Sequence, residues 1–546
     1  MIKTNKIFNN YLKNNYLNIL NYSKNTNNHP NYKTLNKIKE LNKKKLQHQQ
    51  QQEKEQEQNQ SLVNKDEVFK NFYDILKDND NNTTLNNSND DINNINNINN
   101  NTKNNNVKNS LKLKTQIMRD FIQDSLYNQD YGYFQTKEVI ISPNIKIPPL
   151  NSLKNFREYN NYLHYIYKSL EHAWLTPVEL YKPYYSWSIA NYIIDKHNNR
   201  EDKSKNLKIY EIGAGSGTNA LNILNFMRSN HLEIYKTMEY KIIEISKPLA
   251  LKQFNRIKAD HPALNIQINN TSIFNWTHKT EEDECFIILT EVIDNLPHDK
   301  IVLSSNGIFE STVCSTVFET FEKSKSILSN HKSSGYYREE TRQLTDPIIK
   351  EYLEYEEHIK KSSSFFPRIP MLVSIKEFYQ KYLKSFFKDD EERYLPTVCF
   401  KLFQIFSIYF PKHHIVLADF DELPSLVKGE NAPTVQKKIP ITTGDINNPY
   451  HVPGSNPRGY ESIDMEEILT EPGSCDIFFP YDWKNLKQMY CYTNRDRLAN
   501  NFEQVKTYKH KEFLKKYGKD YLNETKTKSG YNPMIRDYGN MSFLLS

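Results

Sequence analysis

Short runs of apolar, β-prone residues recur at regular intervals in the middle of the chain. They are LKIYEI, YKIIEI, LNIQI and CFIILT, at residues 207–212, 240–245, 264–268 and 285–290. Between the first three runs, residues 217–229 and 247–259 carry apolar side chains at helical spacing. Strands that alternate with single helices pair in parallel. This part of the chain therefore predicts a parallel sheet with helices on both of its faces.

Helical and strand-like patterns continue on both sides of this predicted sheet. Ile117, Phe121 and Leu126 lie on one face of a helix predicted within residues 113–134. The segment 140–155 contains three prolines and is predicted to be extended or looped. The other predicted elements are helices at 156–174 and 183–196, strands at 307–314 and 413–420, and a helix-rich insertion at about 335–410.

Polar, low-complexity sequence fills much of the first 110 residues. Residues 46–60 are rich in Gln and Glu, and residues 78–109 form a tract of Asn and Asp. These tracts contribute to the low mean hydropathy of the chain, −0.78. Such segments cannot bury enough apolar surface to offset the entropy lost on ordering. Residues 41–110 are therefore predicted to be disordered.

The positive charge of the chain is concentrated near its N-terminus. Residues 1–60 contain 11 lysines and 4 glutamates, so they carry +7, whereas the whole chain carries +6. The remainder is close to neutral, and no basic face predicts a nucleic-acid partner. The five cysteines show no metal-ligand spacing, so we predict reduced thiols and no metal site. No apolar run approaches the roughly 18 residues that a membrane-spanning helix needs.

The first residues have the composition of a targeting segment. The first 39 residues contain seven lysines and no Asp or Glu, with Ile7, Tyr11 and Ile19 at roughly helical intervals. This pattern is typical of a mitochondrial transit peptide, although the usual arginines are absent. We predict a transit peptide at residues 1–40; the alternative is a disordered tail rich in Lys and Asn.

A glycine-rich turn, EIGAGSG, follows the first predicted strand. Gly213, Gly215 and Gly217 are three of the 14 glycines of the chain. A dinucleotide-binding turn requires a third small residue where Thr218 stands, and a phosphate-binding P-loop requires a Gly-Lys pair that is absent. With Glu211, the spacing E-x-G-x-G-x-G resembles the first motif of class I methyltransferases, which use S-adenosylmethionine. Glycine lets the backbone approach a ligand closely, and the carboxylate suits the ammonium group of that cofactor. The alternative is a turn whose glycines serve packing alone.

Acidic residues follow two more of the predicted strands. Glu244 ends the second strand, where a carboxylate can accept hydrogen bonds from both ribose hydroxyls. Glu291 and Asp294 lie just beyond the fourth strand, at the sheet edge that binds ligands in such folds. Two carboxylates can orient a guanidinium or amine and accept its proton. The alternative is a helix N-terminus carrying acids. Residues 269–276 contain no acid, so an Asn or Ser there is predicted to contact adenine.

We do not assign a site role to the three histidines near the predicted strands. His413 and His414 adjoin a predicted strand and are interpreted as partly buried structure. His298 lies close to Asp294 in the sequence, but a solvated loop position is the favoured interpretation.

Five segments together resemble one family, the MidA-like mitochondrial methyltransferases. They are the opening helix with its GYF ending, LTPVELYKPYYSW, the glycine turn with IIEISKPL, TEVIDNLP, and EPGSCDIFFPYDW at 471–483. The resemblance implies the class I methyltransferase fold, which is Rossmann-like with a doubly wound, mostly parallel sheet and helical additions. It implies S-adenosylmethionine as cofactor and methylation of an arginine in a subunit of respiratory complex I, in the mitochondrial matrix. The site residues it implies are Glu291 and Asp294 for catalysis, and Glu211, Gly213, Gly215, Gly217 and Glu244 for the cofactor.

Some segments depart from the family pattern. Residues 135–143 differ from the expected G-D-F-x-T-S-P, and Pro183, Tyr184 and Tyr185 replace F-G-E. The glycine of a D-Y-G sequence near residue 419 is also lost. The cofactor side is thus better preserved than the substrate side. A non-catalytic assembly factor with this fold, or a methyltransferase for a small molecule, remain alternatives, and no oligomeric state is predicted.

These patterns divide the chain into six predicted parts. They are the transit peptide at 1–40, the disordered region at 41–110, a helical N-terminal part at 111–200, the cofactor-binding core at 201–330, a helical insertion at 331–410, and a C-terminal part at 411–546 that completes the sheet and the substrate side.

Overall fold

The computed structural model describes most of the chain beyond residue 109. The described residues are 110–136, 147–169, 175–200, 202, 204–276, 280–304, 306–319, 337–363, 390–440, 460–499 and 501–546. The predicted transit peptide lies outside the described residues, as does the predicted disordered region except for its last residue.

A seven-stranded sheet forms the centre of the described part. Its order is β14-β15-β10-β5-β2-β3-β4. All neighbours from β10 to β4 pair in parallel, whereas β15 is antiparallel to both β10 and β14. The four strands predicted from the apolar runs are thus confirmed, in parallel pairing. The strands are β2 Lys208–Ile212, β3 Glu239–Ile243, β4 Asn265–Asn269, β5 Cys285–Thr290, β10 His413–Phe420, β14 Lys506–Lys509 and β15 Met541–Leu545.

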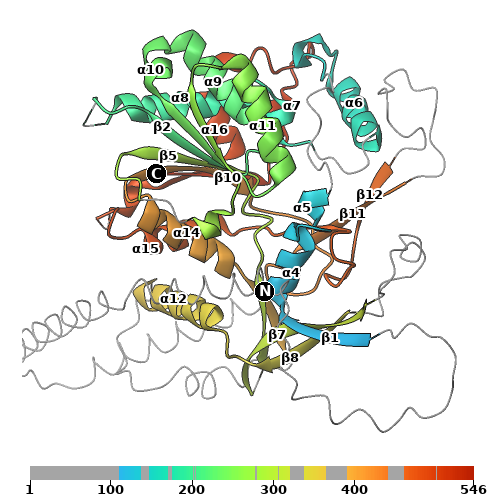
Figure 1. Cartoon of the computed structure of the whole chain (residues 1–546). Coiled ribbons are helices and arrows are strands. Elements are labelled where there is room, and N and C mark those ends of the chain that lie inside the picture. Colours follow the sequence, from blue (N-terminus) through green and yellow to red (C-terminus); the bar gives the residue numbers. More distant parts are fainter. Residues whose placement is uncertain are drawn as a thin grey trace, which may run out of the picture. The chain divides into compact units, whose positions relative to one another are not determined.

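Helices cover both faces of this sheet (Figure 1). One face carries α8 Tyr184–Asn198, α9 Thr218–Asn230, α10 Leu232–Thr237, α11 Lys247–Asp260 and α16 His510–Tyr517. The opposite face carries α14 Thr397–Tyr409 and α15 Trp483–Thr493. Strands that are buried on both faces read as continuous apolar runs rather than alternating ones. This explains why CFIILT, which forms β5, contains no charged residue.

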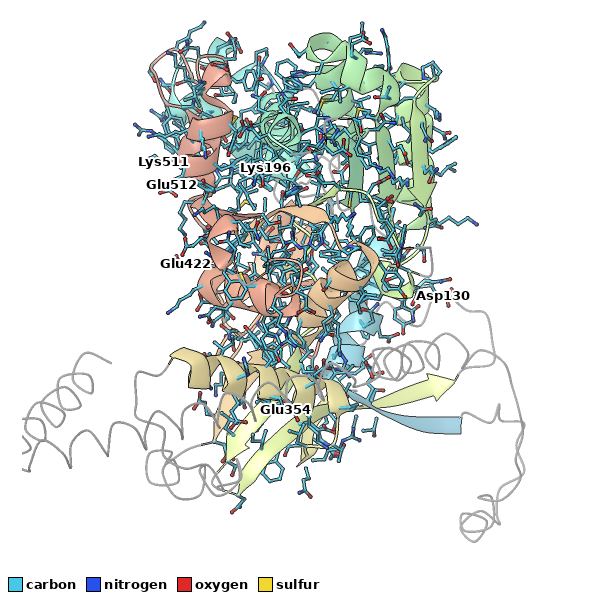
Figure 2. All side chains as sticks on the ribbon, turned by 90° about the vertical axis from the view of Figure 1, so that its left-hand side faces the viewer. Asp130, Lys196, Glu354, Glu422, Lys511 and Glu512 are labelled. Carbon is cyan, nitrogen blue, oxygen red and sulfur yellow. The ribbon has the colours of Figure 1, made fainter. Side chains whose placement is uncertain are left out.

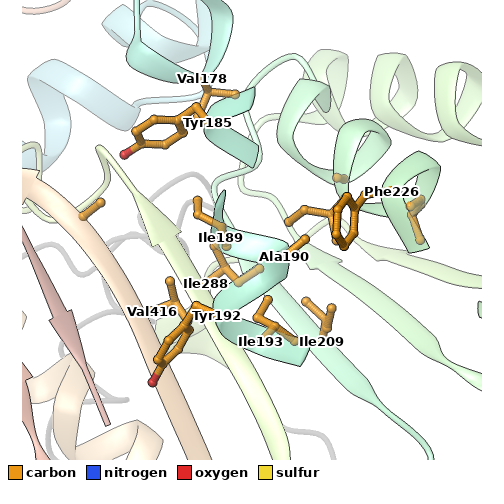
Figure 3. Close-up of a cluster of buried hydrophobic side chains, with 14 of the residues drawn as sticks. Val178, Tyr185, Ile189, Ala190, Tyr192, Ile193, Ile209, Phe226, Ile288 and Val416 are labelled. Carbon is orange, nitrogen blue, oxygen red and sulfur yellow. The ribbon is translucent and has the colours of Figure 1, made fainter. Parts of the chain in front are cut away.

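The apolar core joins α8 to the middle of the sheet. Ile189 and Ile193 of α8 pack in the same cluster as Ile209 of β2, Ile288 of β5 and Val416 of β10 (Figure 3). All five side chains are inaccessible to solvent. The helix predicted at 183–196 is therefore confirmed as α8. Charged side chains such as Glu354, Lys511 and Glu512 instead point outward (Figure 2).

A second, antiparallel sheet was not predicted. Its order is β1-β7-β6-β9, and β8 also pairs with β7, along Phe309–Ser315. The first residues of the helix predicted at 113–134 instead form the end of β1. The predicted insertion contains a helix, α12 Pro347–Ser363, but also two strands of this sheet. The strands are β1 Ser110–Ile117, β6 Asp299–Ser304, β7 Gly307–Glu319, β8 Tyr337–Gln343 and β9 Glu391–Leu395.

The helix α4, Met118–Tyr127, packs against a small third sheet with the order β12-β11-β13. Met118, Phe121 and Leu126 share a buried cluster with Val435 of β11 and Ile477 of β13. This packing brings the N-terminal helix next to a segment more than 340 residues further along the chain. The strands are β11 Thr434–Pro440, β12 Tyr460–Asp464 and β13 Asp476–Phe478.

Short helices complete the described structure. The α-helices are α5 Tyr133–Thr136, α6 Phe156–Ser169, α7 Pro177–Leu180 and α17 Pro533–Arg536, and the 3-10 helices are η1 Leu150–Ser152, η2 Ile273–Asn275, η5 Phe502–Gln504 and η6 Lys519–Tyr521. Across the described ranges, we find no helix with the length and apolar character needed to cross a membrane.

Candidate functional site

The glycine turn connects β2 to α9 at the carboxyl edge of the sheet. Gly213, Gly215 and Gly217 all have positive φ angles, at 65°, 54° and 77°. Residues with a Cβ rarely adopt this left-handed conformation, which glycine enters without steric cost. No side chain caps the start of α9 at Gly217, so its first N–H groups have no such partner.

Close packing is a second reason for glycine in this turn. A Cβ on Gly213 would lie 3.0 Å from Cγ2 of Val292, in the turn that follows β5. A Cβ on Gly217 would lie 3.3 Å from Cγ of Gln253, on α11. The glycine turn is therefore confined between two segments that also leave the carboxyl edge of the sheet.

Glu211 lies within β2 and is almost completely buried. Its Oε1 accepts a hydrogen bond from Nδ2 of Asn219 at 2.9 Å, and its Oε2 accepts one from the hydroxyl of Tyr240 at 2.7 Å. Burial raises the pKa of this carboxyl, while the two hydrogen bonds oppose that shift. Glu211 thus connects β2 to α9 and β3, and its contact with a cofactor stays a prediction.

Glu244 directly follows β3 and is also buried. Its Oε1 accepts from the backbone N–H of Ser246 at 2.9 Å, and its Oε2 accepts from Nε2 of Gln253 at 2.9 Å. The same Nε2 donates to the carbonyl oxygen of Gly215 at 2.8 Å. Gln253 therefore links the acid to the glycine turn. No motif marks Gln253 in the sequence. Burial raises the pKa of Glu244 to about 7.

Asn269 ends β4 and Asn270 follows it, beside Glu244. Nδ2 of Asn270 donates to the carbonyl oxygen of Glu244 at 2.8 Å. Nδ2 of Asn269 is buried, and no described residue accepts its hydrogen bonds. A buried amide without a partner is uncommon. It lies in the segment that was predicted to contact adenine.

Glu179 reaches the glycine turn from the N-terminal side. Thr176 caps α7 by accepting the N–H of Glu179. The buried Glu179 carboxylate accepts a hydrogen bond from the hydroxyl of Ser216, and its other oxygen pairs with Nζ of Lys182 at 3.0 Å. The T-P-E element therefore supports the turn between β2 and α9.

The turn after β5 carries Glu291 and Asp294, and a third carboxylate holds it in place. Glu291 has a φ of 53° and donates its N–H to the carbonyl of Ala418 at 2.9 Å. Asp419, at the end of β10, accepts the next three backbone N–H groups at its Oδ2, at 3.0, 2.9 and 3.3 Å. Its Oδ1 accepts a fourth, from Phe420. The sequence analysis missed Asp419, although it ends an apolar run as Glu211 does.

The alternative interpretation of this turn is wrong. Residues 291–298 form turns and bends that lead into β6, so the acids do not begin a helix.

Within the described ranges, the carboxyl groups of this turn have no basic partner. The half-buried Glu291 side chain makes no hydrogen bond or ion pair within the described ranges, whereas Oδ1 of the buried Asp294 accepts the N–H of Asn295 at 3.0 Å. Burial, then Asp419 and Glu179, raise the pKa of Glu291. Burial, Asp419, Asp476 and Glu291 raise the pKa of Asp294. The predicted pair is thus close enough to interact, and it favours a positively charged ligand.

Three distant motifs meet at this turn. The hydroxyl of Tyr127 donates to the carbonyl of Asn295 at 3.1 Å, and Nδ2 of Asn295 donates to Oδ1 of Asp476 at 2.9 Å. A Cβ on Gly473 would overlap the carbonyl oxygen of Tyr131, so the loop before β13 lies directly against the end of α4. The turn after β5 is therefore contacted by segments from both ends of the described chain, on the side that was predicted to face the substrate.

One histidine interpretation is wrong. His298 is buried, stacked on Phe479 with ring centroids 3.8 Å apart, because apolar residues of β13 cover the turn. Burial lowers its pKa to about 3. His413 is fully buried rather than partly buried, and its ring contacts the hydroxyl of Tyr490 at 2.8 Å. Within the described ranges, no three His, Cys, Asp or Glu residues are grouped to hold a metal, and all five cysteines are free thiols.

Comparisons with known proteins show which proteins this chain resembles. The chain is 24% identical over 327 residues to the mitochondrial protein arginine methyltransferase NDUFAF7 homolog of Schizosaccharomyces pombe, which covers 58% of this chain and 66% of that protein. The chain therefore spans slightly less than two thirds of that relative's length.

Two solved structures of COG1565 superfamily proteins from Burkholderia thailandensis are also similar. One is bound to S-adenosyl-homocysteine and matches with a TM-score of 0.44, and the other, a native structure, matches with 0.43. Each is 11% identical, and each match covers 79% of this chain and 87% of the other. A family model matches residues 188–500 and is described as that of an S-adenosyl-L-methionine-dependent methyltransferase. This chain therefore belongs to that family of S-adenosyl-L-methionine-dependent methyltransferases.

Proposed function

We propose that this chain is a mitochondrial protein arginine methyltransferase that acts in the assembly of respiratory complex I. The observation that carries the proposal is the carboxylate of Glu291, which has no partner among the described residues and lies beside Asp294. The next residue, Val292, packs against Gly213 of the glycine turn. A site with excess carboxylates suits a guanidinium. The relative from Schizosaccharomyces pombe, named a mitochondrial arginine methyltransferase, supports the substrate and the location.

The carboxyl edge of the sheet suits the cofactor of the family. The order β4-β3-β2-β5-β10 reverses direction between β2 and β5, and doubly wound sheets bind their ligands at such a reversal. This order supports the Rossmann-like, class I arrangement. The three left-handed glycines carry no Cβ, and among the described residues Nδ2 of the buried Asn269 amide has no acceptor.

Five residues are proposed to hold the cofactor. Each oxygen of Glu211 and Glu244 accepts one hydrogen bond from the protein and has a further lone pair for a ligand. We assign the ribose hydroxyls to Glu244 and the methionine portion to the turn of Gly213, Gly215 and Gly217, with Glu211 supporting that turn.

The acidic turn supplies the acid–base chemistry. S-adenosylmethionine supplies the methyl group, and its sulfur keeps the electron pair of the broken bond. Glu291 and Asp294 bind the N–H groups of the acceptor and orient its nitrogen, which is most of what the reaction requires. A bound cation favours the ionised form of both carboxyls, which burial otherwise disfavours. Glu291 then takes the proton that the nitrogen loses as its bond to the methyl carbon forms.

Methyl transfer to mitochondrial proteins tests this function. The full chain is incubated with tritiated S-adenosylmethionine and proteins extracted from mitochondria of cells that lack it, and acid hydrolysates are analysed for methylated amino acids. We expect labelled methylarginine, and a loss of at least about 100-fold in Glu291→Gln, which is about 3 kcal/mol of transition-state stabilisation. Calorimetry should show that Glu291→Gln still binds the cofactor.

A non-catalytic assembly factor is the second candidate. It is favoured by the protein donors that already bind every carboxylate oxygen of Glu211 and Glu244, because these bonds also serve the fold. In that case a Gly215→Asp variant would lose cofactor binding yet restore complex I in cells that lack the chain. Failure of Gly215→Asp to restore complex I, together with labelled methylarginine from the wild type, would exclude this candidate.

A further inference from the structure

Tyr185, in the first turn of α8, has a buried hydroxyl with no hydrogen-bond partner among the described residues. Its ring packs against His510 and Phe543, with centroids 5.7 and 6.1 Å away. The side chain lies at the edge of the apolar cluster, and its hydroxyl points away from the other labelled residues (Figure 3). Leaving a buried hydroxyl unpaired costs about 1–3 kcal/mol, so its retention needs a reason.

Other buried tyrosines of this region have partners. The hydroxyl of Tyr192, also on α8, donates to the carbonyl of Ser546 at 3.0 Å. The hydroxyl of Tyr181 donates to the carbonyl of Pro533 at 3.2 Å, and that of Tyr240 donates to Glu211. The unpaired hydroxyl of Tyr185 is therefore not a general property of the phenols packed here.

Glu291 and Asp419 lie near Tyr185. The ring of Tyr185 packs against Phe543, which pairs with Ala418 of β10, and the carbonyl oxygen of Ala418 accepts the N–H of Glu291. Both carboxyls raise the pKa of this phenol, in addition to the larger effect of its burial. Four backbone N–H groups already donate to Asp419. The Glu291 carboxylate makes no hydrogen bond within the described ranges, so we take it as the acceptor for this hydroxyl.

Other groups that face Glu291 are already engaged. Tyr538, from the turn before β15, donates to the carbonyl of Leu175 at 2.9 Å. Tyr167 of α6 makes hydrogen bonds with the backbone of Leu175 and with the side chain of Tyr538. Glu179 of α7 is occupied by Ser216 and Lys182. Asp294, on the same turn as Glu291, is the remaining charged group that faces it.

We propose that Tyr185 is a positioning residue for methyl transfer, and that its hydroxyl donates a hydrogen bond to the carboxylate of Glu291 whenever that group is ionised. This inference rests on the proposed function. The carbonyl of Ala418 holds the N–H of Glu291, and Asp419 holds the N–H of Val292, the next residue, so rotation of the Glu291 side chain is the movement that the proposal requires. One carboxylate oxygen then faces Tyr185, and the other faces the acceptor nitrogen.

The proton balance of this arrangement is simple. The phenol keeps its proton throughout, because burial and the nearby carboxylates raise its pKa. The proton lost by the acceptor nitrogen therefore resides on Glu291, which releases it to solvent after transfer. A hydrogen bond to the ionised carboxylate favours that form, so Tyr185 extends the pH range in which Glu291 acts as a base.

Two phenylalanine variants test the inference in the full chain. Tyr185→Phe removes the unpaired hydroxyl, and Tyr192→Phe removes a buried, hydrogen-bonded hydroxyl from the same helix as the matched control. The rate of methyl transfer from S-adenosylmethionine to mitochondrial extract proteins is measured from pH 5.5 to 9. We expect Tyr185→Phe to shift the acidic limb upward by about one pH unit, with the rate at high pH retained. Tyr192→Phe should leave the limb in place.

Two outcomes would overturn the inference. One is an acidic limb for Tyr185→Phe that superimposes on the wild-type limb. The other is an equal loss of rate at every pH in both variants, since this indicates a packing effect alone. Calorimetry with S-adenosylmethionine separates failure of this inference from failure of the proposed function. A wild-type chain that neither binds the cofactor nor transfers methyl refutes the proposed function. The role of Tyr185 is then tested by a second method.

Infrared titration measures the ionisation of Glu291 directly and requires no methyl transfer. The carboxyl band of Glu291 is assigned as the band that disappears in Glu291→Gln. If Tyr185 donates to the ionised carboxylate, the midpoint of this band moves to higher pH in Tyr185→Phe and stays unchanged in Tyr192→Phe. An unchanged midpoint in Tyr185→Phe would contradict the inference even where methyl transfer is absent.

Discussion

Carboxylates end four strands of the central sheet, and their hydrogen-bond partners distinguish their roles. Glu211 and Asp419 are filled by donors from two or more elements, so they hold neighbouring turns together. Glu244 is held by Ser246 and Gln253 but stands at the end of β3, next to the unused amide of Asn269. Glu291 has no partner within the described ranges. All four side chains are carboxylates, so the hydrogen-bond donors around each one decide which carboxylate is free to bind a ligand.

The pKa of Glu244 predicts that cofactor binding depends on pH. Burial raises this pKa from 4.5 to about 7, so the free protein favours the protonated acid below that pH. The acceptor of ribose hydroxyls is the ionised form, so affinity should rise with pH through 7 and level off above it. We expect binding of S-adenosylmethionine to weaken about tenfold between pH 8 and pH 6, measured by calorimetry. The Glu244→Gln variant should lack this dependence, and a wild-type affinity equal at both pH values would contradict the prediction.

Asp419 predicts a structural effect at a distance from the cofactor. Asp419→Ala removes the acceptor of four backbone N–H groups. We expect the free energy of unfolding, measured by urea denaturation, to fall by roughly 3 kcal/mol, since buried unpaired donors cost about 1–3 kcal/mol each. Methyl transfer should fall more than cofactor affinity. The control is Asp496→Ala, an exposed carboxylate whose removal should change stability by less than about 0.5 kcal/mol. Equal stability of the two variants would show that Asp419 does not hold the turn.

At the scale of elements, the turns after β2 and β5 behave as one unit. Gly213 and Val292 are in contact, Gln253 of α11 joins Gly215 to Glu244, and Asp419 of β10 holds the turn that carries Val292. Four adjacent strands therefore contribute to one continuous layer of contacts. A change in one turn is expected to be felt in the next.

A pair of substitutions tests the contact between these turns. Gly213→Ala introduces a Cβ 3.0 Å from Cγ2 of Val292, at a φ of 65°. We expect a loss of roughly 1–2 kcal/mol in unfolding free energy, with weaker cofactor binding. Adding Val292→Ala should restore the part of the unfolding free energy that is lost through the steric overlap. The part that is lost through backbone strain at residue 213 should remain lost. If Val292→Ala added its own loss with no recovery, the two turns would not be coupled.

The loop before β13 offers a second test at this scale. A Cβ on Gly473 would overlap the carbonyl oxygen of Tyr131, whereas a Cβ on Gly539 would meet nothing within 4 Å. Gly473→Ala should therefore displace the end of α4 and reduce methyl transfer, while Gly539→Ala leaves both unchanged. Proteolysis of α4 in the folded protein reports the displacement. Equal protection in the two variants would show that this contact does not position α4.

For the whole molecule, the sequence predicted the centre of the fold better than its surroundings. The continuous apolar run of β5 predicts a strand buried on both faces, whereas β4 at the edge of the sheet, NIQIN, alternates between polar and apolar residues. The second sheet was missed because LKLKTQI of β1 runs without a break into the helical pattern of α4, and only pairing with β7, nearly 200 residues away, makes it a strand.

The candidate site was predictable where its residues follow strands in a known spacing. Glu211, Glu244, Glu291 and the glycines have such spacing, and the structure brings them to one edge of the sheet. Asp419 also ends an apolar run and was overlooked, whereas Gln253 and the hydroxyl of Tyr185, unpaired among the described residues, could not be found in this way. Their roles depend on which backbone N–H groups and carboxylates the tertiary fold places beside them, and no local pattern records that.

Binding of S-adenosylmethionine to the full chain tests the central claim most directly. Calorimetry at pH 8 compares the wild type with Glu244→Ala and with Glu239→Ala, a partly exposed glutamate of the same strand region that pairs with Lys241. We predict micromolar binding by the wild type and by Glu239→Ala, and at least about tenfold weaker binding by Glu244→Ala, a loss of about 1.4 kcal/mol or more. Equal binding by all three, or no binding by well-folded wild type, would contradict a cofactor site at this edge of the sheet.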